Sequence, residues 1–167
     1  MLAYSYEKEL DDIDRKVLKL VQIDGRISNA ELARQVNLSA PATHARLRQL
    51  EEQGFIRGYA AQLDRERLGF DMLCFIHISL QLHTPAGVDQ FRDAVGKMEE
   101  VLECHHVTGE SDYLLKVAIR NRKDLERFVV KRLTPVPGIA RIHTSLVLTE
   151  VKQTTALPIA DSGAITD

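Results

Sequence analysis

Two arginines, Arg46 and Arg48, lie in a segment whose residues have the spacing of an amphipathic helix. The positions that would face inward recur at helical intervals, namely Thr43, Leu47 and Leu50. Both guanidinium groups would then lie on the outer face, beside His44. Guanidinium groups on an exposed helix can bind phosphate oxygens or the acceptor edge of guanine. The segment therefore predicts recognition of nucleic acid rather than a covalent reaction.

The neighbouring residues predict how this helix is positioned. Ser39 is a suitable N-cap, Pro41 falls in the first turn where its missing N–H costs nothing, and Gly54 suits a left-handed C-terminal residue. A shorter helix precedes it, beginning near residue 28 or 29, and its apolar stripe is formed by Leu32, Ala33 and Val36. Residues 37–38 would make the tight turn between the two helices. A third helix is predicted upstream, where apolar residues recur from Leu10 to Val21 behind an acidic first turn.

This arrangement is typical of a helix-turn-helix, whose second helix fits the major groove of double-stranded DNA. Six residues are predicted to lie at that contact: Ser39, Ala42, His44, Arg46, Arg48 and Arg26. The helix offers few hydrogen bonds to base edges, so we expect loose specificity for A/T-rich, repeated sites. Two alternatives remain open. The two helices could form a hairpin that packs in the core without binding DNA. Arg46 could form an ion pair with Glu51 or Glu52 instead of contacting DNA. Residues 55–63 are expected to be extended or to form a wing.

Composition limits the other possibilities. The chain has 167 residues and a net charge of −2, but residues 26–48 hold four arginines against one acid, Glu31. A basic region on a weakly acidic body is compatible with DNA binding. Cys74 and Cys104, with no leader-like or long apolar segment, indicate reduced thiols and a cytoplasmic protein without a membrane span.

The second half of the chain alternates between strand-like and helix-like patterns. Strands are predicted at residues 72–82, 101–107, 113–119 and 141–151, and helices at residues 87–98 and 122–133. This β-α-β-β-α-β order is the ferredoxin-like pattern, giving an α+β protein. We expect a DNA-binding domain at 1–55, a connecting segment at 56–70, the βαββαβ domain at 71–152 and a tail at 153–167 whose end is mobile. The sheet face that the helices leave open is expected to carry apolar residues and to be an oligomer interface.

Residues 108–112, Thr-Gly-Glu-Ser-Asp, form a polar turn between two of these strands. Gly109 permits a positive φ and leaves room for a ligand beside the backbone. Amides of such a turn can hold a carboxylate, and Asp112 could receive an ammonium group. The alternative is a hairpin loop in which Asp112 caps its own turn.

Catalytic and metal-binding patterns are weak. Cys104 and His106 share a face of a strand, but a closed zinc site needs about four ligands and no spaced partner pair follows. The acidic run at residues 99–103 is typical of a solvated rim, and no known catalytic motif occurs. We therefore expect no cofactor and no metal. The competing hypothesis is a ferredoxin-like enzyme or carrier with a helical appendage that does not touch DNA.

The chain resembles the leucine-responsive/asparagine regulator (Lrp/AsnC) family over nearly its whole length. The stretches that carry the resemblance are DDIDRKVL, DGRISNAELARQVNLS, RLRQLEEQGFIRGY, ECHHVTGESDYLLKV and LTEVKQTT. The family implies a winged helix-turn-helix, a connecting strand, an effector-binding βαββαβ domain, and dimers that assemble into octamers. It also implies an amino-acid effector bound between subunits, at His106, Thr108, Gly109, Glu110, Asp112 and Ser145. His106 stands where leucine-responsive members have leucine, which implies a more polar effector pocket.

Overall fold

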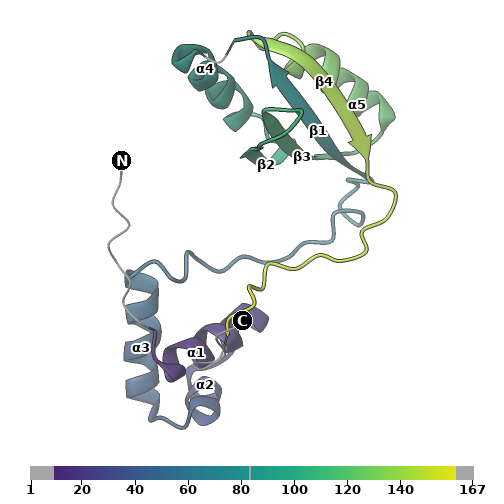
Figure 1. The fold of residues 1–167 in the computed structure, drawn as a ribbon. Helices are drawn as coiled ribbons and strands as arrows, with labels where there is room; N and C mark the ends of the chain where they lie inside the picture. The colour runs from purple at the N-terminus through teal and green to yellow at the C-terminus, as the bar shows by residue number, and fades with distance from the viewer. Residues whose placement is uncertain (1–9, 83, 161–167) are drawn as a thin grey trace. The chain divides into compact units, whose positions relative to one another are not determined.

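The computed structural model describes residues 10–82 and 84–160, and Figure 1 shows their fold. The chain divides into two compact units. The first combines residues 1–62 with residues 152–167, and the second comprises residues 63–151. The chain therefore passes between the units twice, and the tail belongs to the same unit as the predicted helix-turn-helix.

The first unit contains three helices, α1 (Asp12–Ile23), α2 (Asn29–Val36) and α3 (Ala40–Glu52). Each begins at a side chain that accepts a backbone N–H of its own first turn, Asp11, Ser28 and Ser39 respectively. The core that joins them is apolar and consists of Val17, Leu18, Val21, Leu32, Val36 and Leu50. Gly54 follows α3 with φ +78°, as the sequence predicts. The predicted helix-turn-helix is confirmed.

The segment after α3 differs from the expected wing and connecting strand. Residues 57–64 form irregular chain, and the described part of the first unit contains no β-strand. Tyr59 nevertheless holds this segment against the helices, because its hydroxyl donates to Glu51 Oε1 at 2.9 Å. A Cβ on Gly25 would lie 3.1 Å from the Tyr59 ring, so the ring packs directly on the turn after α1. The Tyr59 side chain, rather than pairing between strands, thus holds this segment on the helices.

The tail docks on α1. Gln22 Nε2 donates to the Leu157 carbonyl at 3.0 Å, and the Leu157 N–H donates to Gln22 Oε1 at 2.9 Å. Ile159 packs against the core of the three helices. The mobile end that the sequence suggests, residues 161–167, lies outside the described residues. The preceding part of the tail is fixed by one amide and one apolar side chain.

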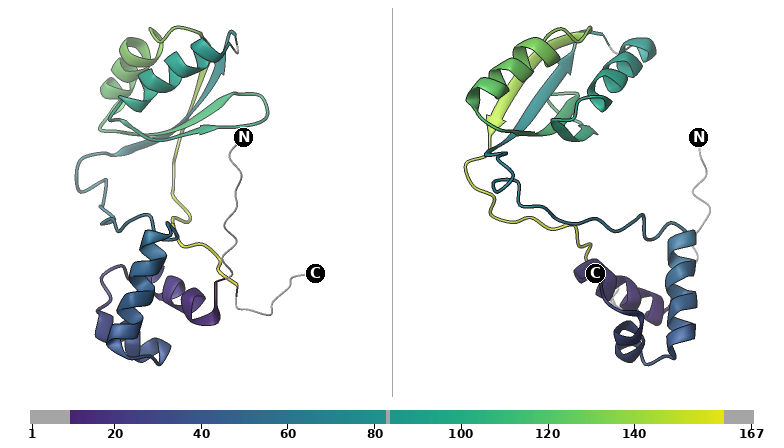
Figure 2. Two further views of the ribbon diagram at one scale, coloured as in Figure 1. Left: turned by 90° about the vertical axis from the view of Figure 1, so that its left-hand side faces the viewer. Right: turned by 180° about the vertical axis from the view of Figure 1, so that it is seen from behind.

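The second unit is a four-stranded antiparallel sheet in the order β2-β3-β1-β4. Its strands are β1 (Met72–Leu80), β2 (Val101–His106), β3 (Tyr113–Ile119) and β4 (Ile139–Leu146). Helix α4 (Pro85–Gly96) and helix α5 (Arg122–Phe128), which continues as a π-helical turn (Val129–Leu133), lie on the same face of the sheet (Figure 2). The predicted βαββαβ fold is confirmed, although β4 begins two residues earlier and ends five residues earlier than predicted.

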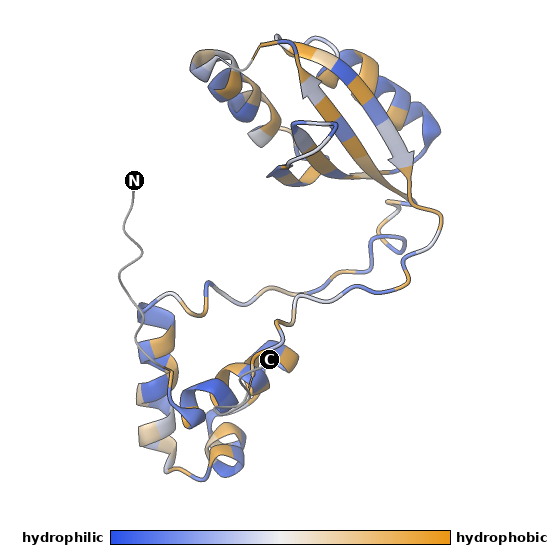
Figure 3. Ribbon diagram, viewed as in Figure 1, coloured by the Kyte–Doolittle hydropathy of each residue, from blue (hydrophilic) through white to orange (hydrophobic). Residues whose placement is uncertain are grey.

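The two faces of the sheet differ in composition. Along β1, the buried residues Cys74, Ile76, Ile78 and Leu80 alternate with half-buried ones. Figure 3 shows the strand hydrophobic along its first part and alternating in colour only toward its end. The buried set packs under the helices with Phe91 and Phe128. The uncovered set on β1 is Phe75, His77 and Ser79, and its partners on β4 are Ser145, His143 and Arg141. The part of the open face formed by β1 and β4 is therefore mainly polar, with Phe75 as its apolar member, so it carries fewer apolar residues than expected.

Candidate DNA-binding and effector-binding sites

The outer face of α3 carries most of the residues that the sequence assigns to DNA. Ala42, His44 and Arg48 are exposed, as is Arg26 in the turn before α2. Ser39 has a local role, because its hydroxyl accepts the Ala42 N–H at 3.4 Å and caps the helix. Thr43 is fully buried and donates to the Ser39 carbonyl at 3.0 Å, which fixes which face of α3 points outward. This presentation matches a helix that enters a major groove.

Arg46 makes contacts that the sequence analysis missed. Its Nη1 lies 2.6 Å from Asp11 Oδ2 and 2.7 Å from Asp14 Oδ1, and its side chain is only 32% exposed. The hydrogen bonds to these carboxylates raise the pKa of Arg46. The pKa of Asp11 is lowered, mainly by the Asp14 N–H and further by Arg46. Arg46 therefore links α3 to the N-terminus of α1, and its predicted contact with DNA stays a prediction.

Arg48 is better placed to reach a polyanion. Its Nε lies 2.8 Å from Glu52 Oε1, but both side chains are largely exposed, at 70% and 63%. An exposed pair of this kind contributes little and can be exchanged for a phosphate contact. Glu51 and Glu52 balance the two arginines, so α3 has no net charge.

In the second unit, the turn at residues 108–112 has the predicted backbone. Gly109 adopts φ +119°, and a Cβ at this position would have no atom within 4 Å. Asp112 makes a contact that neither sequence interpretation included, since its Oδ2 accepts the Leu80 N–H at 2.7 Å. Leu80 lies at a register shift between β1 and β4, which explains why its N–H needs a side-chain acceptor. Asp112 thus fastens the turn to β1.

Two of the predicted effector residues lie far apart in one chain. His106 pairs with Tyr113 on the helix-covered face, and the two rings stack at 4.9 Å. Ser145 pairs with Phe75 on the open face. Strands β2 and β4 are also the opposite edges of the sheet. His106 and Ser145 therefore cannot line one cleft within a single chain, and a shared pocket requires residues from different subunits.

A different set of residues does converge beside the turn. A hollow of about 310 Å³ on the open face is lined by His77, Ser79, Glu110, Ser111, Arg141 and His143. The imidazoles of His77 and His143 lie 5.8 Å apart, and Arg141 Nη2 donates to the Glu110 carbonyl at 3.2 Å. Only Glu110 belongs to the set that the sequence analysis named. Strand alternation places His77 and His143 on one face, but the pairing of β1 with β4 was needed to bring them together.

The other reactive groups have structural explanations. No cluster of three potential metal ligands occurs within residues 10–82 and 84–160. Both cysteines are free thiols, and burial raises the pKa of each. Glu103 is paired with His105 and Lys116 at 3.0 Å each, and these contacts lower its pKa. The acidic rim is thus partly neutralised by its own strand neighbours.

Comparison with known proteins assigns both units. The Lrp/AsnC ligand binding domain matches residues 73–157, and a winged helix-turn-helix DNA-binding domain matches residues 10–57. The chain belongs to the Lrp/AsnC family. The leucine-responsive regulatory proteins of Escherichia coli K12 and Klebsiella pneumoniae are each 43% identical to it over 152 residues, which cover 91% of this chain and 93% of theirs. It is therefore a DNA-binding transcriptional regulator of the Lrp/AsnC type and not an enzyme.

Solved structures of Lrp/AsnC regulators have the same fold. A transcriptional regulator of Neisseria meningitidis in complex with L-Met is 38% identical, with a TM-score of 0.86 over 89% of this chain and 96% of that one. An AsnC family regulator of Agrobacterium tumefaciens is 29% identical, with a TM-score of 0.84 over 89% and 96%. The feast or famine regulatory protein of Mycobacterium tuberculosis, complexed with L-methionine, is 30% identical, with a TM-score of 0.82 over 90% and 99%. In the described part of this chain, no helix is both long and apolar enough to cross a membrane.

Proposed function

We propose that this Lrp/AsnC regulator binds a free amino acid beside the turn at residues 108–112, and that binding changes its affinity for DNA or its assembly. The observation that carries this proposal is the open glycine turn next to a polar hollow. Gly109 leaves the backbone uncovered, and the hollow at its side contains Arg141, Glu110 and two imidazoles. Two relatives of known structure were solved with L-methionine, which supports an amino acid as the ligand class.

The effector's charged groups have natural partners at this place. Its carboxylate would be bound by backbone amides of the turn, and its ammonium group by a carboxylate, Asp112 or Glu110. The remaining predicted residues, His106, Thr108 and Ser145, would complete the pocket only where subunits meet. A site shared between subunits couples occupancy to assembly, because the ligand then has different affinities for assembled and separated states.

Self-association is part of the proposal, with a dimer as the smallest unit and an octamer as the expected assembly. Exposed apolar side chains gather where the chain enters and leaves the second unit: Leu63, Leu68, Leu146, Leu148 and Val151. The Arg65–Glu150 ion pair, at 3.0 Å, holds these two segments together. Burial between copies would remove this apolar surface from water, and residues 59–63 are proposed to pair near the two-fold axis. Sedimentation of a stable monomer at micromolar concentration would contradict this.

As a DNA-binding protein, the regulator is inferred to act in the cytoplasm.

The effector site is tested by a thermal-shift screen of the twenty amino acids, followed by calorimetry with the hits. Asp112→Asn retains an oxygen that can accept the Leu80 N–H but removes the charge, and Glu110→Gln removes the neighbouring charge. We expect the variant that lacks the ammonium partner to bind about 10- to 100-fold more weakly. Asp89→Asn, on the exposed part of α4, is the matched control and should bind like the parent. Unchanged affinity in both turn variants would place the pocket elsewhere.

A further inference from the structure

Positive charge is concentrated in one short segment of the second unit. Residues 120–132 contain six cations and two carboxylates, a net charge of +4, whereas the whole chain carries −2. The rest of the chain therefore carries −6. The cations are Arg120, Arg122, Lys123, Arg127, Lys131 and Arg132, and all six are exposed. We call them the α5 surface.

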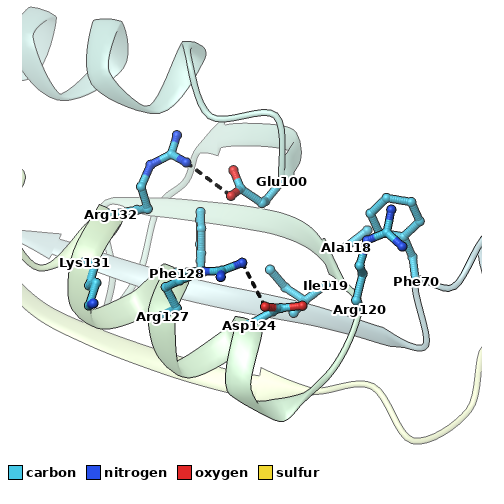
Figure 4. A pocket seen from close by; sticks show the side chains of 10 residues that line it. All are labelled: Phe70, Glu100, Ala118, Ile119, Arg120, Asp124, Arg127, Phe128, Lys131 and Arg132. Atoms are coloured by element: carbon cyan, nitrogen blue, oxygen red, sulfur yellow. Dashed lines mark hydrogen bonds and ion pairs between the residues drawn. The ribbon is translucent and has the colours of Figure 1, made fainter.

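Four of the six cations of the α5 surface lack an internal counter-charge. Arg127 pairs with Asp124 at 2.8 Å and Arg132 pairs with Glu100 at 3.2 Å, as Figure 4 shows. The other four cations form no ion pair within the described residues: Arg120, Arg122, Lys123 and Lys131. Holding like charges this close without partners disfavours the isolated fold, and the charge is neutralised when a polyanion binds.

The shape of this surface also suits a ligand that is larger than a single ion. Arg120, Arg127, Lys131 and Arg132 line a hollow of about 500 Å³. The Arg120 guanidinium lies over the Phe70 ring at 4.9 Å, which holds it at one edge of the hollow. Arg122 and Lys123 extend the positive charge beyond the hollow. Charge that continues outside a cavity fits an extended phosphate backbone better than a small anion.

The helix-turn-helix unit carries a smaller net positive charge. Residues 10–62 hold eight cations and seven carboxylates, a net charge of +1, and both arginines of α3 are paired within the chain. Counterion release from DNA scales with the number of phosphates that cations neutralise. Because α3 has no net charge, the contribution of counterion release to the binding free energy must come largely from cations elsewhere in the protein.

We propose that the α5 surface is a second DNA-binding surface, which contacts phosphates of double-stranded DNA without reading sequence. The proposal rests on the DNA-binding function of the family and adds a region outside the helix-turn-helix. Such contacts would contribute equally on any sequence, whereas the outer face of α3 determines which sequence is preferred.

The test is the salt dependence of DNA binding by the full-length protein with Arg122→Gln, Lys123→Gln and Lys131→Gln combined. A long duplex with several A/T-rich sites is titrated between 50 and 200 mM salt. The slope of log affinity against log salt should fall in magnitude by about 2 to 3, since each lost phosphate contact removes about 0.9. The loss should be equal on specific and unrelated sequences. Lys97→Gln, an exposed lysine on the same unit, is the control and should leave the slope unchanged.

Three outcomes would overturn the proposal: an unchanged slope in the triple variant, an equal change in the Lys97 control, or a change in sedimentation that makes the α5 surface an assembly contact. If the triple variant folds poorly, Lys131→Gln alone should still lower the slope by about 0.9. The swap of Arg122→Lys with Lys123→Arg preserves charge and should preserve the slope. Failure of the parent protein to bind any DNA would instead contradict the regulator function itself.

Discussion

Helix α3 and the α5 surface hold their cations in different ways. In the helix-turn-helix unit, Arg46 is held by Asp11 and Asp14, and Arg48 by Glu52. In the effector unit, the α5 surface keeps several cations without internal partners. The difference indicates that the helix which reads the bases is not the main source of positive charge. Helix α3 would then recognise the shape of the DNA and the methyl groups of its bases, whereas the second unit would supply electrostatic attraction to the phosphates.

The largest effect is expected for Arg46, because its removal leaves Asp14, only 14% exposed, without its cation. Arg46→Ala should lower the free energy of unfolding of the first unit by about 2 kcal/mol, measured by urea denaturation. Arg34→Ala is the matched control, since Arg34 pairs with Glu31 but is 73% exposed, and it should leave the stability of the unit almost unchanged. Equal costs for the two variants would show that Arg46 is not a structural link.

The second largest loss of stability is expected where the tail contacts α1. Gln22→Ala removes both amide hydrogen bonds to Leu157 and should destabilise the first unit by about 1 kcal/mol. Gln53→Ala, an exposed residue at the end of α3, should have almost no effect. Thermal unfolding distinguishes the two. Equal melting temperatures for the Gln22 variant and the parent would show that the docked tail does not stabilise the helices.

Arg48→Gln should separate DNA contact from stability. Because the Arg48–Glu52 pair is exposed, the stability should change by less than about 0.5 kcal/mol. The salt slope of DNA binding should nevertheless fall in magnitude by about 0.9, the value of one phosphate contact. A DNA-binding titration at several salt concentrations measures this. An unchanged slope would assign α3 no phosphate contact through Arg48 and would strengthen the contrast with the α5 surface.

The smallest effect is expected for the stability of the first unit at low pH. The folded-state pKa of Asp11 is lowered below its ordinary value of 3.8, mainly by the Asp14 N–H. Its contribution is therefore present above about pH 4 and is lost as the pH falls through the folded value. Asp11→Asn keeps an N-cap acceptor but cannot titrate. Because the Asp11 side chain is 49% exposed and solvent screens its charge, the first unit should lose only a few tenths of a kcal/mol less than the parent between pH 5 and pH 3. Identical pH profiles of unfolding in the two proteins would contradict this.

Local patterns predicted the parts of the molecule that are built from neighbouring residues. The caps at Ser28 and Ser39, the turn glycine at Gly54 and the order of the strands all follow from residues a few positions apart. The partners of Arg46 could not be predicted in this way, because they lie on another helix. The hollow at His77 and His143 requires the pairing of β1 with β4, and the polar character of the open face follows from the same pairing.

The central claim, that this protein is a regulator whose DNA binding responds to an amino acid, is tested by one titration. A labelled A/T-rich duplex with repeated sites is titrated with the protein, without ligand and with the amino acid that calorimetry shows to bind, at saturation. We expect the apparent affinity or the stoichiometry of the complex to change, by at least about fivefold for affinity, in line with ordinary coupling between sites. The same affinity and the same stoichiometry with the effector fully bound would contradict the account.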